Sequence, residues 1–263
     1  KNSIMVMPLA MACIAGAAMG AGEQDAARLG KDLTPAGAEP GANKDGSIPA
    51  WSGTAAPMPG WEYGKKRVDY WKHKGDKPLF SIDASNVDKY ADKLAAGQVA
   101  VIKQIKGYRM DVYASHRECG MPDFVVENTK KNVAKAKLAA DGWGLADAVV
   151  PGLPFPIPAN GTQAMWNAKM RYRGVGILFP HINTAVSPRK GSTDWIIAGQ
   201  ELTFYYPWGV KGSNDLGKYP PVEYYVLFQY DSPPALAGQA LSVTFFLDKP
   251  GSETFYYFPG QRR

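Results

Sequence analysis

The chain has 263 residues and a mass of 28.5 kDa, which is enough for one large domain or two small ones with a buried core. The formal net charge is +6, but the basic side chains are interspersed with acidic ones rather than massed on one segment, and no nucleic-acid-binding motif is present. Nucleic acid is therefore not expected as a partner. The sequence also contains neither a Walker loop nor a GxGxxG motif, so no nucleotide cofactor is expected.

The first elements are typical of a secretory signal peptide. Residues 1–20 begin with a basic residue, continue as an apolar run over Ile4–Ala18, and end in small residues before Ala21. A membrane anchor is the alternative, but the run is shorter than the ~20 residues that a spanning helix needs. Cys13 as a lipoprotein acceptor is a third possibility. After cleavage before Ala21, Cys119 is the one cysteine left.

Residues 21–79 are rich in Gly, Pro, Ala and charged residues and show little periodicity. This composition predicts an extended arm rather than a packed domain. Trp51, Trp61 and Trp71 lie within it and are candidate partner-binding residues, since aromatic side chains are favoured anchors at interfaces.

Helical signals follow between about 83 and 141. Asn86 is a possible N-cap before a periodic run, and Pro122 begins a longer helix that Gly142 is expected to end. A strand is predicted over 108–113 from the alternation in YRMDVY. The proline-rich stretch 143–161 is predicted to be a fixed loop, and a short helix is expected over 163–168.

From about 172 to 258 the chain consists of runs of aromatic and β-branched residues separated by Gly, Pro, Asn and Asp. This pattern predicts a meander of antiparallel strands, and hence an α+β fold. Alternation assigns Leu202, Phe228 and Leu241 to one face, and Tyr205, Tyr225, Phe246 and Tyr256 to the other.

Both faces of this sheet are apolar, so both must be covered. The helices can cover one face. The other suits a hydrophobic ligand, although further chain packed as ordinary core is an equal alternative. Arginine at the mouth of such a site can bind carboxylate or phosphate head groups. The candidate ligand-binding residues are Tyr205, Tyr225, Phe228, Phe246, Tyr256, Arg173 and Arg262.

One segment, ASHRECGMPDF, places His116, Glu118 and Cys119 together and raises the alternative of a thiol enzyme. No nucleophile motif accompanies these residues, so no catalytic residue is predicted. His73, His116 and His181 lack the spacing of zinc motifs, so neither a metal nor a cofactor is expected.

Several blocks of the sequence resemble a known family. They include RLGKDLTPAGAEPGANKDGSIPAW, GYRMDVYASHRECGMPDFVVENT, GLPFPIPANGTQAMWN and ETFYYFPGQRR. These are similar to proteobacterial envelope proteins that share domain of unknown function 1329. The resemblance implies relatives of the lipoprotein-sorting proteins LolA and LolB, with an incomplete antiparallel β-barrel, helices covering its concave face and a cavity for acyl chains. Family members are longer, so the chain looks like an N-terminal portion whose strand at 253–258 lacks a following strand.

From the residues and the resemblance together we expect three parts: a signal peptide at 1–20, the arm at 21–79, and part of a LolA-like domain at 80–263. The expected function is noncatalytic binding or transport of a lipidic or other hydrophobic molecule in the periplasm, in association with the outer membrane. The alternative is an envelope adaptor that docks on an outer-membrane protein or a hydrophobe-exporting transporter without a small-molecule ligand.

Overall fold

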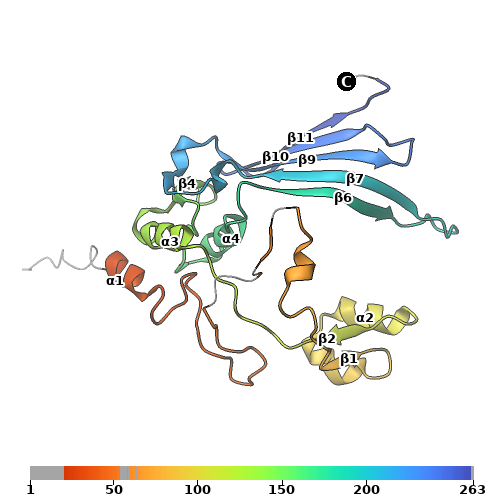
Figure 1. Cartoon of the computed structure of the whole chain (residues 1–263), viewed down its shortest axis with the longest axis horizontal. Helices are drawn as coiled ribbons and strands as arrows, with labels where there is room; N and C mark the ends of the chain where they lie inside the picture. Colours follow the sequence, from red (N-terminus) through yellow and green to blue (C-terminus); the bar gives the residue numbers. More distant parts are fainter. Residues whose placement is uncertain (1–20, 54–57, 59, 63, 262–263) are drawn as a thin grey trace, which may run out of the picture. The chain divides into compact units, whose positions relative to one another are not determined.

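The computed structural model describes residues 21–53, 58, 60–62 and 64–261 (Figure 1). The described chain divides into two compact units. The first contains the residues up to 38 and those from 122 onwards, and the second contains residues 39–121. The boundary expected near residue 80 falls inside the second unit. The predicted signal peptide, Cys13 and Arg262 lie outside the described residues.

An antiparallel five-stranded sheet is the largest sheet of the first unit, which confirms the predicted meander and the α+β class. The order across the sheet is β11-β10-β9-β7-β6, and the sheet is open rather than closed into a barrel (Figure 1). The strands are β6 (Gly176–Val186), β7 (Ile196–Tyr205), β9 (Val222–Ser232), β10 (Ala240–Phe246) and β11 (Ser252–Tyr257).

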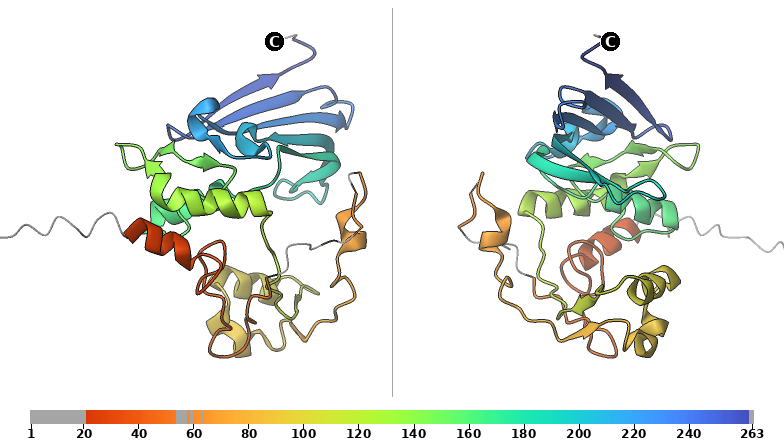
Figure 2. Two further views of the ribbon diagram at one scale, coloured as in Figure 1. Left: turned by 60° about the vertical axis from the view of Figure 1, so that its left-hand side comes forward. Right: turned by 90° about the vertical axis from the view of Figure 1, so that its right-hand side faces the viewer.

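Helices α1 (Ala21–Arg28), α3 (Asp123–Lys135) and α4 (Gly161–Lys169) also belong to this unit, and Figure 2 shows α3 and the sheet as separate layers. Helix α4 contains the predicted 163–168 but begins two residues earlier, at Gly161, because the side chain of Asn160 accepts a hydrogen bond from the backbone N–H of Gln163. The main core lies beside one end of the sheet. Its largest fully buried side chains are Trp166, Trp208, Tyr206, Met170 and Leu247.

Helix α3 is shorter than the sequence predicted. It ends at Lys135 rather than near Gly142, because the next residues form strand β3 (Lys137–Leu138), which pairs with β4 (Leu145–Asp147). The fixed loop is likewise interrupted by β5 (Val149–Val150), which pairs with β8 (Asn214–Asp215). Two 3-10 turns, η3 (Pro207–Gly209) and η4 (Leu216–Lys218), lie on either side of β8.

The proline-rich stretch that follows β5 is held by buried polar side chains of α3. Asn132 donates to the carbonyl oxygens of Val149 and Leu153 and accepts from the N–H of Val149. The hydroxyl of Thr129 accepts from the N–H of Leu153. These contacts satisfy backbone groups that would otherwise be buried without partners, so the loop is fixed although it has no regular structure.

The second unit is small and has its own core of Ile82, Val87 and Ile102. Strands β1 (Phe80–Ile82) and β2 (Met110–Val112) pair antiparallel, which confirms the strand predicted at 108–113. The predicted helical run after Asn86 is a 3-10 helix. The remaining elements are η1 (Arg67–Tyr70), η2 (Val87–Lys93) and α2 (Ala96–Gln104). Among the described residues, no helix has the length and hydrophobicity to cross a membrane.

Candidate functional site

The first candidate site is one surface of the five-stranded sheet, here called face A. Cα pairing joins five large apolar side chains into a row that crosses all five strands. In strand order the row is Phe179, Leu202, Phe228, Leu241 and Tyr256. Phe179 is 40% exposed and the other four are partly buried. The row is therefore a continuous apolar strip that the described chain covers only in part.

A second row on face A connects this strip to the core. It consists of Ile177, Phe204, Val226, Val243 and Thr254. Ile177 and Phe204 pack against the core cluster that contains Trp166 and Met170. Face A therefore packs against the core at one end, and its apolar surface continues outward to the strip.

The opposite surface, face B, is more polar. The row Leu178, Thr203, Leu227, Ser242 and Phe255 alternates apolar side chains with hydroxyls. Its apolar members are strongly exposed, with Leu178 at 46%, Leu227 at 51% and Phe255 at 69%. Because each strand presents successive side chains to opposite faces, Phe228 and Leu227 are neighbours in sequence but lie on different surfaces.

The structure divides the predicted ligand-binding residues between the two faces. Tyr205 and Tyr225 lie together on face B, with stacked rings whose centroids are 6.0 Å apart. Phe228 and Tyr256 lie on face A. The assignment of Tyr256 to the face of Tyr205 is wrong, because Tyr256 pairs with Leu241. Phe246 follows a break in register and has Lys249 Nζ 3.9 Å from its ring centroid.

Arg173 is partly buried in the first unit rather than placed on the strip. Its Nη1 donates to the hydroxyl of Tyr206 at 3.0 Å. Near it, Lys169 Nζ lies 2.6 Å from a carboxylate oxygen of Glu223, whose side chain is only 5% exposed. Burial raises the pKa of Glu223, although Lys169 acts in the opposite direction. The roles of Arg173 and Arg262 at the mouth of a ligand site stay predictions.

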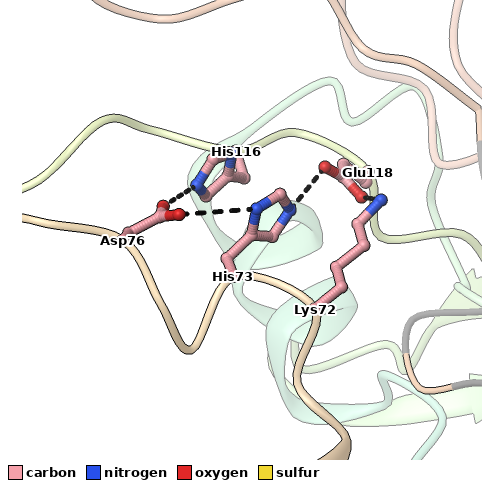
Figure 3. Close-up of polar contacts among 5 residues, drawn as sticks. All are labelled: Lys72, His73, Asp76, His116 and Glu118. Carbon is pink, nitrogen blue, oxygen red and sulfur yellow. Dashed lines mark hydrogen bonds and ion pairs between the residues drawn. The ribbon is translucent and has the colours of Figure 1, made fainter.

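The second candidate site is a group of charged and imidazole side chains in the second unit, shown in Figure 3. Its members are Lys72, His73, Asp76, His116 and Glu118. The pairing of β1 with β2 brings them together. In this antiparallel ladder Phe80 pairs with Val112. Asp76 lies four residues before Phe80 and His116 lies four residues after Val112, so continuing the register brings Asp76 opposite His116.

A second set of contacts fixes the segment that carries His116 and Glu118. The guanidinium of Arg117 donates to the carbonyl oxygens of Glu39, Gly41 and Pro49. On the same segment, the carbonyl oxygen of Cys119 accepts from the indole N–H of Trp51 at 3.1 Å. The segment 39–52 therefore holds the chain between His116 and Glu118 and directly after Glu118.

Within the group, each histidine contacts a carboxylate. His116 Nε2 lies 2.6 Å from Asp76 Oδ2, and His73 Nε2 lies 2.7 Å from Glu118 Oε1 (Figure 3). Lys72 forms an ion pair with the other oxygen of Glu118. The two imidazole rings are stacked, with centroids 3.5 Å apart. Burial and the neighbouring His116 lower the pKa of His73, which favours its neutral form.

Two sequence-based hypotheses concern residues of this unit. Cys119 is exposed and free, and His116 is paired with Asp76. Trp61 and Trp71, like Trp51, are partly buried and make contacts inside their own unit: Trp61 donates to the carbonyl of Lys65, and Trp71 packs edge-on against His73. Partner binding by the three tryptophans stays a prediction.

Known proteins show where this chain belongs. The model of the family "Protein of unknown function (DUF1329)" matches residues 81–263. The chain belongs to the DUF1329 family. A Pseudomonas aeruginosa protein described as "Uncharacterized protein PA3922" is 36% identical over 259 residues, a match covering 97% of this chain and 56% of the relative. The chain thus spans about half the length of that relative. A comparison with solved structures finds no significant match.

Proposed function

We propose that this DUF1329 chain binds a lipidic or other hydrophobic molecule noncovalently on face A, as a binding or carrier protein rather than an enzyme. The observation that carries the proposal is the row from Phe179 to Tyr256, which is apolar at every strand and only partly covered. Large, partly exposed apolar surfaces of this kind mark sites for ligands or partners.

The dimensions of the strip suit an extended apolar chain. With neighbouring strands about 4.8 Å apart, five strands span roughly 19 Å. An acyl chain laid along the row would gain about 0.8 kcal/mol for each CH₂ group that it buries. Affinity of this kind needs no polar chemistry, which fits the two described rows of face A, whose hydroxyl-bearing members are Tyr256 and Thr254 at the β11 edge.

The proposal also covers the cellular location of the protein and the fold type to which its sheet belongs. A LolA/LolB-like lipid carrier in the periplasm, associated with the outer membrane, is the role that the apolar strip and the predicted signal peptide together favour. The open antiparallel sheet with α4 packed beside one end of face A supports this assignment at the level of architecture.

Variants of neighbouring residues can distinguish binding on face A from binding on face B. The purified chain is titrated with a fluorescent long-chain fatty acid in Phe228→Ser, Leu202→Ser and Leu227→Ser variants. We expect each face A variant to weaken binding by about tenfold, which corresponds to about 1.4 kcal/mol of lost apolar contact. Leu227→Ser is the matched control on face B and should bind as the wild type does.

Circular dichroism and thermal unfolding identify any variant that fails to fold, and two face A variants keep the test open if one fails. Native mass spectrometry of protein exported to a periplasm and purified without detergent adds an independent measurement, because a retained lipid-sized adduct names the ligand class. Equal binding by wild type and both folded face A variants would show that the strip is not the site.

A further inference from the structure

The group around His73 and His116 belongs to the second unit, whereas the strands of the proposed lipid site belong to the first, and it contains atoms of the kinds that bind metal ions. We propose that His73, Asp76 and His116 bind a divalent transition-metal ion, with Zn²⁺ as the ion of reference. One donor atom from each of these three residues lies within 4.8 Å of the other two. Two imidazoles and one carboxylate are a ligand set that zinc uses in proteins.

The hydrogen bonds of the group leave the required lone pair on His73. A carboxylate accepts hydrogen bonds, so Glu118 Oε1 at 2.7 Å fixes the hydrogen of His73 on Nε2. Nδ1 then keeps its lone pair and faces Asp76 Oδ1 at 4.0 Å. A carboxylate on the second nitrogen of a metal-binding histidine is the usual outer-shell partner, because it orients the ring and increases its basicity.

The other histidine needs one proton rearrangement. His116 Nε2 lies 2.6 Å from Asp76 Oδ2 and shares a hydrogen with it. When the ion binds between these two atoms, the hydrogen moves to Nδ1 and the imidazole stays neutral. Both rings also turn out of their stack, because the lone pairs of parallel rings do not converge on one ion. Binding therefore replaces the ring stack and the direct contact between His116 and Asp76.

Charge and rigidity also favour a cation here. Asp76 and Glu118 contribute two negative charges and Lys72 one positive charge, so the group is net negative when both imidazoles are neutral. The β1–β2 ladder joins the two backbone segments next to the group, and the contacts of Arg117 hold the segment that carries His116 and Glu118 before the ion arrives. Three protein ligands leave a tetrahedral ion at least one position for water or for a donor atom of a ligand.

The direct test measures Zn²⁺ binding to the full chain by competition with a chromophoric chelator, together with the visible absorption of bound Co²⁺. We expect one ion per chain. Asp76→Asn, which keeps the size of the side chain, and His116→Ala should each weaken Zn²⁺ binding by at least about 100-fold. Glu118→Gln should weaken it by about 10- to 100-fold through the orientation of His73.

Two matched controls make the result specific. His181 forms a histidine–carboxylate pair with Asp231 on the sheet, so His181→Ala should leave Zn²⁺ affinity unchanged. Cys119→Ser should also leave it unchanged, because the thiol is not a proposed ligand. Circular dichroism establishes that each variant is folded. The proposal is overturned if the wild type binds no Zn²⁺, if Asp76→Asn and His116→Ala bind it normally, or if either control variant loses it.

Discussion

The ion pair between Lys169 and Glu223 offers the sharpest test of the core. The Glu223 side chain is 5% exposed, and Lys169 Nζ lies 2.6 Å from Oε2. Replacing Lys169 with Met keeps the length of the side chain and its packing against Trp143 and Trp166, but it leaves the carboxylate buried without its main partner.

Removing one partner from a buried pair destabilises a protein by about 3–5 kcal/mol. We expect the lower end, about 3 kcal/mol, because the positive charge of Arg173 also favours the ionised carboxylate of Glu223. Urea unfolding followed by tryptophan fluorescence measures the loss, and Trp166 and Trp208 of the affected core report on it directly.

The stability lost in Lys169→Met should depend on pH, and the direction of that dependence follows from the pKa of Glu223. Burial raises the pKa of Glu223 in the folded protein above its unfolded value, and the loss of Lys169 raises it further. A raised carboxyl pKa favours the folded state below the unfolded pKa, and that stability is lost as pH rises through the folded pKa. The loss of stability in Lys169→Met should therefore be large at neutral pH and shrink as the solution is acidified.

Two further variants make the reasoning refutable. Adding Glu223→Gln to Lys169→Met removes the unpaired charge and should restore most of the lost stability. Lys130→Met breaks an exposed pair with Glu127 and should change stability by less than about 0.5 kcal/mol. A loss below about 1 kcal/mol in Lys169→Met, or a loss that is the same at acidic and neutral pH, would refute the assignment of Glu223 as a buried carboxylate that depends on Lys169.

Three more predictions concern the frame of the first unit, each measured as the free energy of urea unfolding. Asn132→Ala leaves three backbone groups of the proline-rich stretch without partners and should cost about 3 kcal/mol, whereas Lys131→Ala beside it should stay within about 0.5 kcal/mol. Asn160→Ala removes the cap of α4 and should cost about 1 kcal/mol. Gly37→Ala should cost about 3 kcal/mol, because an added Cβ would lie 1.7 Å from the carbonyl oxygen of Pro156. Gly30 has a similar positive φ but open space around it, so Gly30→Ala should cost only about 1 kcal/mol. Equal losses within either matched pair would contradict the contact assigned to it.

The sequence predicted the elements better than their pairing. The strands between 172 and 258 were evident because aromatic runs and turn residues are local signals, and a short helix was expected where α4 lies. The end of α3 was not, because it depends on strand β3 pairing with β4. The face of Tyr256 was misassigned for the same reason: alternation orders residues within β11, but the turn after β10 sets which of them faces Leu241.

The histidine group shows the same limit on a functional question. Motif spacing searches for ligands close together in sequence, whereas Asp76 and His116 are 40 residues apart. The strand at 108–113 was predicted, but its partner at 80–82 was not. The pairing of these two strands is what brings Asp76 and His116 close together. Such a group could be found from the sequence once an antiparallel pair of strands is predicted. The signal is a histidine and a carboxylate that lie the same number of residues beyond the pair, one on each strand's segment.

Register therefore decides which side chains meet in both units. A slip of one residue between β10 and β11 would bring Phe255 to face A in place of Tyr256 and would break the row where it reaches the sheet edge. A slip of one residue between β1 and β2 would move Asp76 away from His116. Neither change alters composition, periodicity or the identity of any element. The candidate sites of this chain must therefore be argued from pairs of strands, because no single segment contains all the residues of a site.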